Sequence, residues 1–79
     1  MKRGAYSIDG VVAPGGLEVR AKRVVIAGRI IGRVNVYADT VEVKKTCDYS
    51  EGTIDCIFIK IEEGANLEGV TINQRTSRN

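Results

Sequence analysis

The chain has 79 residues, of which 28% are charged and 43% are hydrophobic, and its net charge is +2. A chain of this length forms one small domain and buries only about 60% of the surface that it exposes when unfolded. The charge is too small to indicate nucleic-acid binding on its own, and no apolar run is long enough to span a membrane.

Most of the chain repeats one apolar pattern, in segments that begin at Val19, Val36 and Ile54. The offsets +2, +5, +7, +11 and +13 hold apolar residues or Gly, namely Ala21, Val24, Ile26, Ile30 and Gly32, then Ala38, Val41, Val43, Cys47 and Tyr49, then Cys56, Ile59, Ile61, Ala65 and Leu67. Residues two apart in an extended chain share a face, so each segment predicts three short strands. Such strands, recurring at this nearly constant spacing, are typical of a three-sided parallel β-helix whose inward residues stack in columns. We therefore predict an all-β fold, a short parallel β-helix of about four turns.

Two other β architectures compete with this interpretation. A meander barrel needs hairpin turns, and Asp9-Gly10 is the one dipeptide of that kind near a strand pattern. A left-handed hexapeptide helix needs a small aliphatic residue at every sixth position, but stepping from Val36 reaches Glu42 and Asp48. The barrel stays open as an alternative, whereas the hexapeptide pattern fails.

Residues 1–18 are expected to form an incomplete first turn of a single domain that spans residues 1–73. Counting one repeat back from the first full segment places Tyr6, Ile8 and Val12 at inward positions. Pro14-Gly15-Gly16 should interrupt the strands at a corner, because Pro lacks the N–H that a ladder needs and Gly tolerates a positive φ. The simpler alternative is a cap that keeps water off the next turn.

The first full segment carries a group of basic residues that should face outward: Arg20, Lys22, Arg23 and Arg29. Such a group could bind phosphate, RNA or acidic lipid headgroups, although a solvated face explains it more simply. Val25 and Ile31 should point outward beside these residues, so part of this surface is apolar.

Charge is unevenly distributed along the chain. Residues 1–33 carry seven basic and two acidic residues, a charge of +5, whereas residues 34–79 carry five basic and eight acidic residues, a charge of −3. Since sequence order is spatial order along a β-helix, we expect one basic and one acidic end. Between neighbouring turns, Glu42 should lie over Lys60 as a favourable pair worth about a few tenths of a kcal/mol.

The third segment is followed by Val70 and Ile72, which begin a fourth turn. Ile57 and Phe58 occupy a corner where the earlier turns have polar residues, which makes this corner apolar and a further candidate for lateral contact. Residues 74–79 are polar and basic without periodicity, and we expect them to form a disordered tail.

Both cysteines fall at inward positions of the pattern. Cys56 shares its column with Ala21 and Ala38, and Cys47 shares its column with Ile30 and Ala65, so both are expected to be small core residues with reduced thiols. A disulfide, metal or redox role is the weaker alternative, because the two residues are nine apart and the chain has no His and no CxxC.

Two stretches resemble the bactofilins, bacterial cytoskeletal proteins that form polymers. They are Val36-Tyr37-Ala38-Asp39-Thr40-Val41-Glu42-Val43 and Ile59-Lys60-Ile61-Glu62-Glu63-Gly64-Ala65-Asn66-Leu67-Glu68-Gly69, and the similarity covers roughly residues 19–72. The resemblance implies a right-handed β-helix and non-polar filaments that assemble end to end without nucleotide. It also implies a role in cell shape or in localising partners.

The residue content argues against catalysis. The chain lacks His, and with it Ser-His and Cys-His nucleophile pairs and the base of β-helix acyltransferases. Glu62-Glu63, together with Asp48 and Glu51, should be solvated at corners, and the Gly-rich stretches match no phosphate-loop spacing. We therefore predict no enzyme activity, no cofactor and no metal site.

Two classes of function remain, a self-assembling scaffold and a small basic module that binds nucleic acid or an acidic membrane surface. The scaffold is favoured because the chain has only four aromatic residues on which bases could stack. The expected polymerisation interface consists of the apolar residues of the two end turns: Tyr6, Ile8, Val12, Leu67, Val70 and Ile72.

The expected partner is another copy of the chain, in an end-to-end homopolymer. Contacts to a membrane surface or to other cytoskeletal or cell-wall proteins are compatible with such a polymer, and a nucleic-acid partner is not favoured. A basic start at Met1, Lys2 and Arg3 is not followed by the apolar segment of a secretory signal. We therefore expect a cytoplasmic protein, with the inner face of the membrane as a second location.

Overall fold

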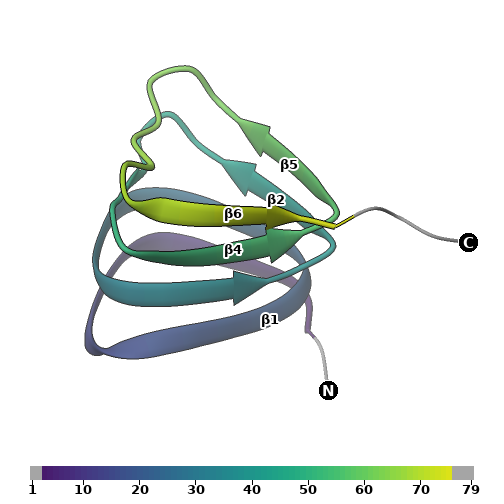
Figure 1. Ribbon diagram of the computed structural model, residues 1–79, viewed down its shortest axis with the longest axis horizontal. Coiled ribbons are helices and arrows are strands. Elements are labelled where there is room, and N and C mark those ends of the chain that lie inside the picture. Colours follow the sequence, from purple (N-terminus) through teal and green to yellow (C-terminus); the bar gives the residue numbers. More distant parts are fainter. Residues whose placement is uncertain (1–2, 76–79) are drawn as a thin grey trace, which may run out of the picture.

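A computed structural model describes residues 3–75 of the chain. These residues form strands and connecting turns without a helix. The strands are β1 (Arg3–Tyr37), β2 (Thr40–Val43), β3 (Asp48–Tyr49), β4 (Gly52–Cys56), β5 (Phe58–Ile61) and β6 (Val70–Gln74). β1 is a single extended run of 35 residues that passes around several corners of the molecule (Figure 1).

All strand pairings are parallel, and each joins a segment to the corresponding segment one turn later. The sheet order is β5-β2-β1-β4-β6, and β3 pairs with β1 on the remaining side. Figure 1 shows the chain winding upward from the N-terminus, with β4 and β6 stacked on one side and β2 and β5 on another. The fold is a short, right-handed, three-sided parallel β-helix, as the repeat and the family resemblance predicted.

Two of the three sides have the register that the sequence pattern predicts. On the first side, Val36 pairs with Ile54, which pairs with Ile72. On the second side, β2 lies between β1 and β5, so Val41 stacks between Val24 and Ile59. Side chains in the inner part of these columns are fully buried, because each has a neighbour above and below.

On the third side the pairing of β1 with β3 differs from the predicted register by two positions, whereas the bridge between Asp48 and Asn66 has the predicted register one turn later. Ile30 pairs with Tyr49, where the sequence pattern placed Cys47 over Ile30 and Tyr49 over Gly32. The reason is the corner before β3, where the backbone N–H of Cys47 donates to the carbonyl of Lys44 at 3.0 Å in a tight turn. This corner is longer by two positions than the corresponding corner one turn earlier, which shifts the third side by the same amount.

The first turn also has a corner of unexpected length, since the inward residues Ile8 and Val11 are one position closer in sequence than predicted. Val12 was expected to point inward, but its side chain is 71% exposed, and Val11 packs against the core instead. The separation of Val11 from Ile30 equals that of Ile30 from Tyr49, so Val11 continues the observed column of this side. The expected break at Pro14-Gly15-Gly16 is also absent, because β1 continues through these residues and turns the corner at Gly16, whose φ is 92°.

A glycine makes a close backbone approach possible between the turns that contain β4 and β1. Gly52 has a φ of 135°, and a Cβ at this position would collide with the carbonyl oxygen of Val34 one turn below. The buried hydroxyl of Tyr49 donates a hydrogen bond to the same carbonyl oxygen. Tyr49 is the largest fully buried side chain, so this corner combines a large core residue with a polar group that has a partner.

The C-terminal strand extends further than expected. β6 includes Gln74, the first residue of the segment predicted to be a disordered tail. Arg75 also has defined partners, since its backbone N–H donates to the carbonyl of Cys56 at 2.6 Å and its guanidinium forms an ion pair with Asp55. The remainder of the predicted tail, residues 76–79, lies outside the described residues.

Candidate functional site

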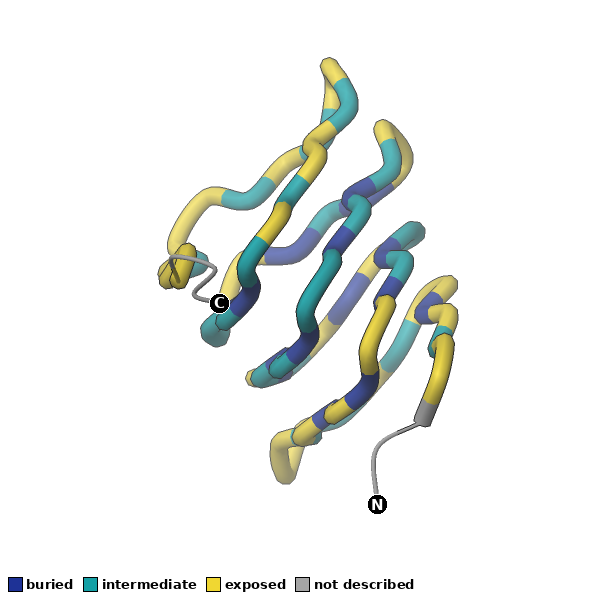
Figure 2. The backbone as a smooth tube through the Cα atoms, turned by 90° about the vertical axis from the view of Figure 1, so that its right-hand side faces the viewer, coloured by how far each residue is buried: buried dark blue, intermediate teal, exposed yellow. Residues whose placement is uncertain are grey.

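The turn at the C-terminal end of the β-helix leaves its inward side chains open. No residue between 57 and 75 is buried, and Figure 2 shows this end in the exposed and intermediate colours while the inner turns carry the buried ones. Ile61 is 45% exposed although its column partner Val43 is fully buried. The predicted end residues Leu67, Val70 and Ile72 are half-buried and pack on the core from one side only.

The turn at the N-terminal end is more closed. Ile8 is only 2% exposed, and Tyr6, Val11 and Leu17 are half-buried against the core. Of the three residues predicted for this end, Tyr6 and Ile8 do point inward and Val12 does not. The apolar surface that the described residues offer is therefore larger at the C-terminal end.

The outer strands of the C-terminal end also have free edges within the described part of the chain. β5 pairs with β2 and β6 pairs with β4, and both stand at the ends of the strand order. An edge strand presents backbone N–H and C=O groups that can pair with another strand. β5 carries Phe58, which is 60% exposed, so the predicted apolar corner at residues 57 and 58 does lie on the surface at this end.

The predicted basic group does not form one surface. Arg20 lies beside Glu18, with its guanidinium 4.6 Å from the centre of the Tyr37 ring. Arg23 belongs to the second side, where it pairs in register with Thr40, and Arg29 belongs to the third side. Arg20, Arg23 and Arg29 therefore lie on three different sides of the β-helix and point away from one another.

Successive turns form outward ladders on the first side. Arg20, Tyr37 and Asp55 line one shallow hollow together with Ala38 and Arg75. The guanidinium of Arg75 also donates to the carbonyl of Ala38 at 3.1 Å. These contacts tie together the turns that begin at Val19, Val36 and Ile54, so we assign the ladder to stability.

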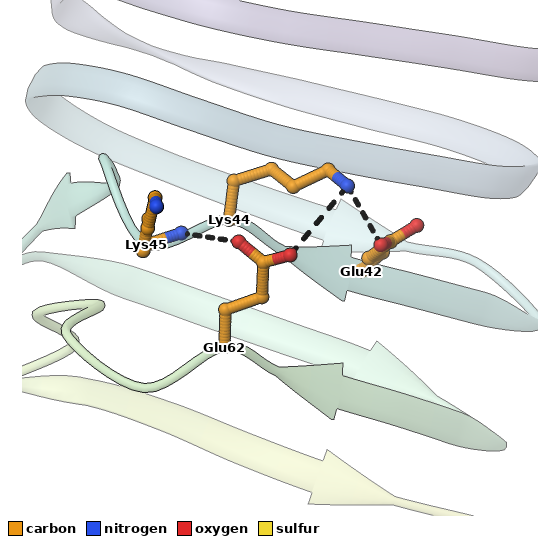
Figure 3. A network of polar contacts seen from close by, with 4 residues as sticks. All are labelled: Glu42, Lys44, Lys45 and Glu62. Atoms are coloured by element: carbon orange, nitrogen blue, oxygen red, sulfur yellow. Dashed lines mark hydrogen bonds and ion pairs between the residues drawn. The ribbon is translucent and has the colours of Figure 1, made fainter.

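The second side carries a network of charges in which Lys44, rather than the predicted Lys60, is the main partner of Glu42. Glu42 and Lys60 are register neighbours as predicted, but the side chain of Glu42 accepts a hydrogen bond from Lys44 at 2.8 Å. Figure 3 shows that Lys44 also approaches Glu62 of the next turn, and that Glu62 accepts a hydrogen bond from the backbone N–H of Lys45 at 2.8 Å. The hydrogen bond and charge of Lys44 lower the pKa of Glu42, and those of Glu42 raise the pKa of Lys44.

The two halves of opposite charge meet inside the molecule rather than marking its ends. Residues 22–38 carry four basic and no acidic side chains, whereas residues 39–56, one turn further on, carry five acidic and two basic ones. The two turns are joined by ion pairs between Arg29 and Asp48, at 3.8 Å, and between Arg33 and Glu51, at 3.7 Å. The expectation of one basic and one acidic end is therefore replaced by a basic turn lying directly on an acidic turn.

Both cysteines are free and buried, as the pattern predicted. Burial raises the pKa of the Cys47 thiol to about 11, with a further contribution from the charge of Asp48. Burial also raises the pKa of Cys56. A thiol with a raised pKa is a poor nucleophile at neutral pH, which agrees with a packing role for both residues.

Among residues 3–75, no three His, Cys, Asp or Glu side chains lie close enough together to hold a metal ion. The same residues contain no helix that could cross a membrane. Comparisons with protein-family models, with curated proteins and with solved structures give no match for this chain.

Proposed function

We propose that the protein is a self-assembling scaffold whose molecules stack end to end through their terminal turns, without nucleotide. The observation that carries this proposal is the open C-terminal turn. Ile61 is 45% exposed at a position that is fully buried one turn earlier, and β5 and β6 lie at the edges of the sheet. A second copy placed on this end would bury these side chains and pair the free edges.

The shape of the molecule makes its ends energetically important. In a β-helix of about four turns the strands are only about 4.8 Å apart, so the two end turns are a large share of the structure. Repeat proteins whose terminal repeats lack a polar cap gain stability by association, because the hydrophobic surface of the last repeat has no other cover. Contacts that repeat without closing on themselves give an open filament.

The test compares two lysine substitutions on neighbouring residues of β6. Ile72 points into the column of Val36 and Ile54, whereas Thr71, the preceding residue, is exposed on the outer surface. Ile72→Lys places a charge in the proposed interface, and Thr71→Lys places the same charge beside it. Filaments seen by electron microscopy should be lost in the first variant and retained in the second, with β-rich circular dichroism in both.

The N-terminal end allows a second matched pair. Val11 packs against the core and Val12 points outward, so Val11→Lys should weaken assembly and Val12→Lys should not. Wild-type protein that remains monomeric by sedimentation at high concentration would refute the proposal. Filaments that survive Ile72→Lys and Val11→Lys would refute the assignment of the interface to the end turns.

The wider interpretation extends this proposal to the cell. A bactofilin-like role in cell shape or in localising partners, in the cytoplasm or at the inner face of the membrane, agrees with the short β-helix and its stacking ends. The alternative, a basic module for RNA or acidic lipid, has less support because Arg20, Arg23 and Arg29 lie on different sides. Binding to RNA or anionic vesicles that falls steeply with salt would favour that alternative.

A further inference from the structure

The third side of the β-helix carries two rows of opposite charge with an apolar residue between them. The basic row consists of Arg29 and of Arg33 at the corner that leads into the first side, and the acidic row consists of Asp48 and Glu51 one turn later. Ile31 lies between the two arginines and is 48% exposed. A shallow hollow on this surface is lined by Arg29, Ile31, Asp48 and Glu51, together with Ile30, Gly32 and Ser50.

The charges within this surface pair with one another only loosely. The Arg29–Asp48 and Arg33–Glu51 distances are 3.8 and 3.7 Å, beyond the range of a hydrogen bond. The side chains of Arg29 and Arg33 are 75% and 68% exposed. Each guanidinium has five N–H donors, so both arginines can bind carboxylates of a second molecule as well.

The arrangement of the two rows is complementary to itself. If two copies meet through this side with their helix axes antiparallel, a two-fold axis between the two turns places the basic row of each copy over the acidic row of the other. The strand direction is preserved by this rotation, and Arg29 is the register partner of Asp48. Arg29 of one copy therefore faces Asp48 of the other, and Ile31 faces the small side chain of Ser50.

A parallel arrangement of the two copies is unfavourable. It would place the basic row of one molecule against the basic row of the other, and the same holds for the acidic rows. Like charges that meet at an interface oppose association and suppress the wrong geometry. The charge pattern thus selects one orientation.

From this pattern we infer that the third side is a lateral contact between two antiparallel copies of this chain, paired through Arg29 and Arg33 of one with Asp48 and Glu51 of the other. The contact does not require end-to-end stacking. A surface about 20 Å on each side has an area of about 400 Å², which is less than the roughly 800 Å² that each partner buries in a stable interface. Association of single molecules is therefore weak, and filaments gain from its repetition along their length.

The experiment uses two charge-reversed variants that should not pair with themselves. Arg29→Glu with Arg33→Glu makes both rows acidic, and Asp48→Arg with Glu51→Arg makes both rows basic. When the two variants are mixed, the acidic rows of one molecule face the basic rows of the other. Within each molecule the two rows still carry the same charge. Only a contact between molecules can be rescued in this way.

All variants carry Ile72→Lys to block end stacking, so the result does not depend on whether filaments form. Sedimentation at about 10 mM salt, where the screening length is about 30 Å, should show a one-to-one complex in the mixture and monomers in each variant alone. Four exposed pairs should strengthen the mixed complex at least about tenfold over each variant alone. The complex should dissociate at about 1 M salt.

A matched control separates this contact from attraction between proteins of opposite net charge. The variant with Lys22→Glu and Arg23→Glu has the same change in net charge as the variant with Arg29→Glu and Arg33→Glu. Its two substituted residues are exposed and lie away from the third side. Its mixture with Asp48→Arg, Glu51→Arg protein should form no mixed complex. Equal association in this control, or no association in the designed mixture, would overturn the inference.

A second test applies if a double variant does not fold. Ile31→Lys should abolish the weak dimerisation of the Ile72→Lys protein at high concentration, and Ser7→Lys, on another side, should not. Unchanged dimerisation in Ile31→Lys, or monomers already in the parent, would also contradict the lateral contact.

Discussion

Replacement of Gly52 by alanine should strongly destabilise the molecule. Gly52 begins β4 with a φ of 135°, a backbone conformation that residues with a side chain rarely adopt. Its Cβ would collide with the carbonyl oxygen of Val34 and would lie 2.7 Å from the hydroxyl oxygen of Tyr49. The backbone carbonyl cannot move without disturbing the ladder between β1 and β4.

The size of the effect follows from two contributions. Strain at a glycine-only backbone position costs about 1–3 kcal/mol, and crowding in a packed interior costs about 1–3 kcal/mol. The total of about 4 kcal/mol compares with an expected unfolding free energy of about 4–12 kcal/mol for 79 residues. With an unfolding entropy of about 2.1 cal/mol/K per residue, the midpoint of thermal unfolding should fall by about 20 °C.

Urea unfolding followed by circular dichroism measures this difference. The Ile72→Lys background keeps assembly from adding to the stability of the native state. Gly15→Ala is the matched control, because Gly15 has no atom within 4 Å of its Cβ position and no positive φ; its effect should be within about 0.5 kcal/mol. If Gly52→Ala costs no more than Gly15→Ala, the close approach at this corner is not real.

Three further predictions concern the core and the charge network. Both Cys47 and Cys56 should react slowly with thiol reagents in the native protein and rapidly in urea, whereas fast native labelling of either would contradict its burial. Because the Cys47 pKa rises from 9.0 to about 11 on folding, the native state holds a proton that the unfolded state loses in this range. The free energy of unfolding, measured by urea titration at each pH, should therefore fall as pH rises from 9 to 11. In the Cys47→Ala variant it should fall less steeply over the same range. Since Lys44 lowers the pKa of Glu42, the contribution of Glu42 is present at neutral pH and lost in acid; Glu42→Gln should flatten the acid side of the same profile, and an unchanged profile would mean that the pair is not formed.

The repeat predicted the fold because its signal comes from local geometry. Period-two alternation fixes which side chains point inward, and the recurrence of the pattern fixes which strands stack, so the columns of Val36 and Val41 follow from spacing alone. The length of a corner has no such constraint. The tight turn at Lys44 and Cys47 accommodates two additional positions, which shifted β3 along β1. The first turn has a different corner, one position shorter than predicted, and this left Val12 outside.

The candidate site was predicted less completely. The sequence identified the apolar residues of the end turns, but it contained no signal that the C-terminal end is more open than the N-terminal end. The pairing of Arg29 with Asp48 was also missed, because the separation of these residues differs from the predicted repeat. A search for opposite charges one repeat apart, with a tolerance of two positions, would have found both Arg29–Asp48 and Arg33–Glu51.

The stacking of each turn on the previous one also orders the folding of the chain. Every strand pairing joins segments only one turn apart in sequence, so each new turn closes a loop of similar and modest length. The basic turn and the acidic turn supply the most buried columns, and we expect the folding nucleus to form there and to extend in both directions. The turn that contains β5 and β6 would then be the last to form and the first to open, and a neighbouring molecule stacked on it, as proposed, would hold it closed.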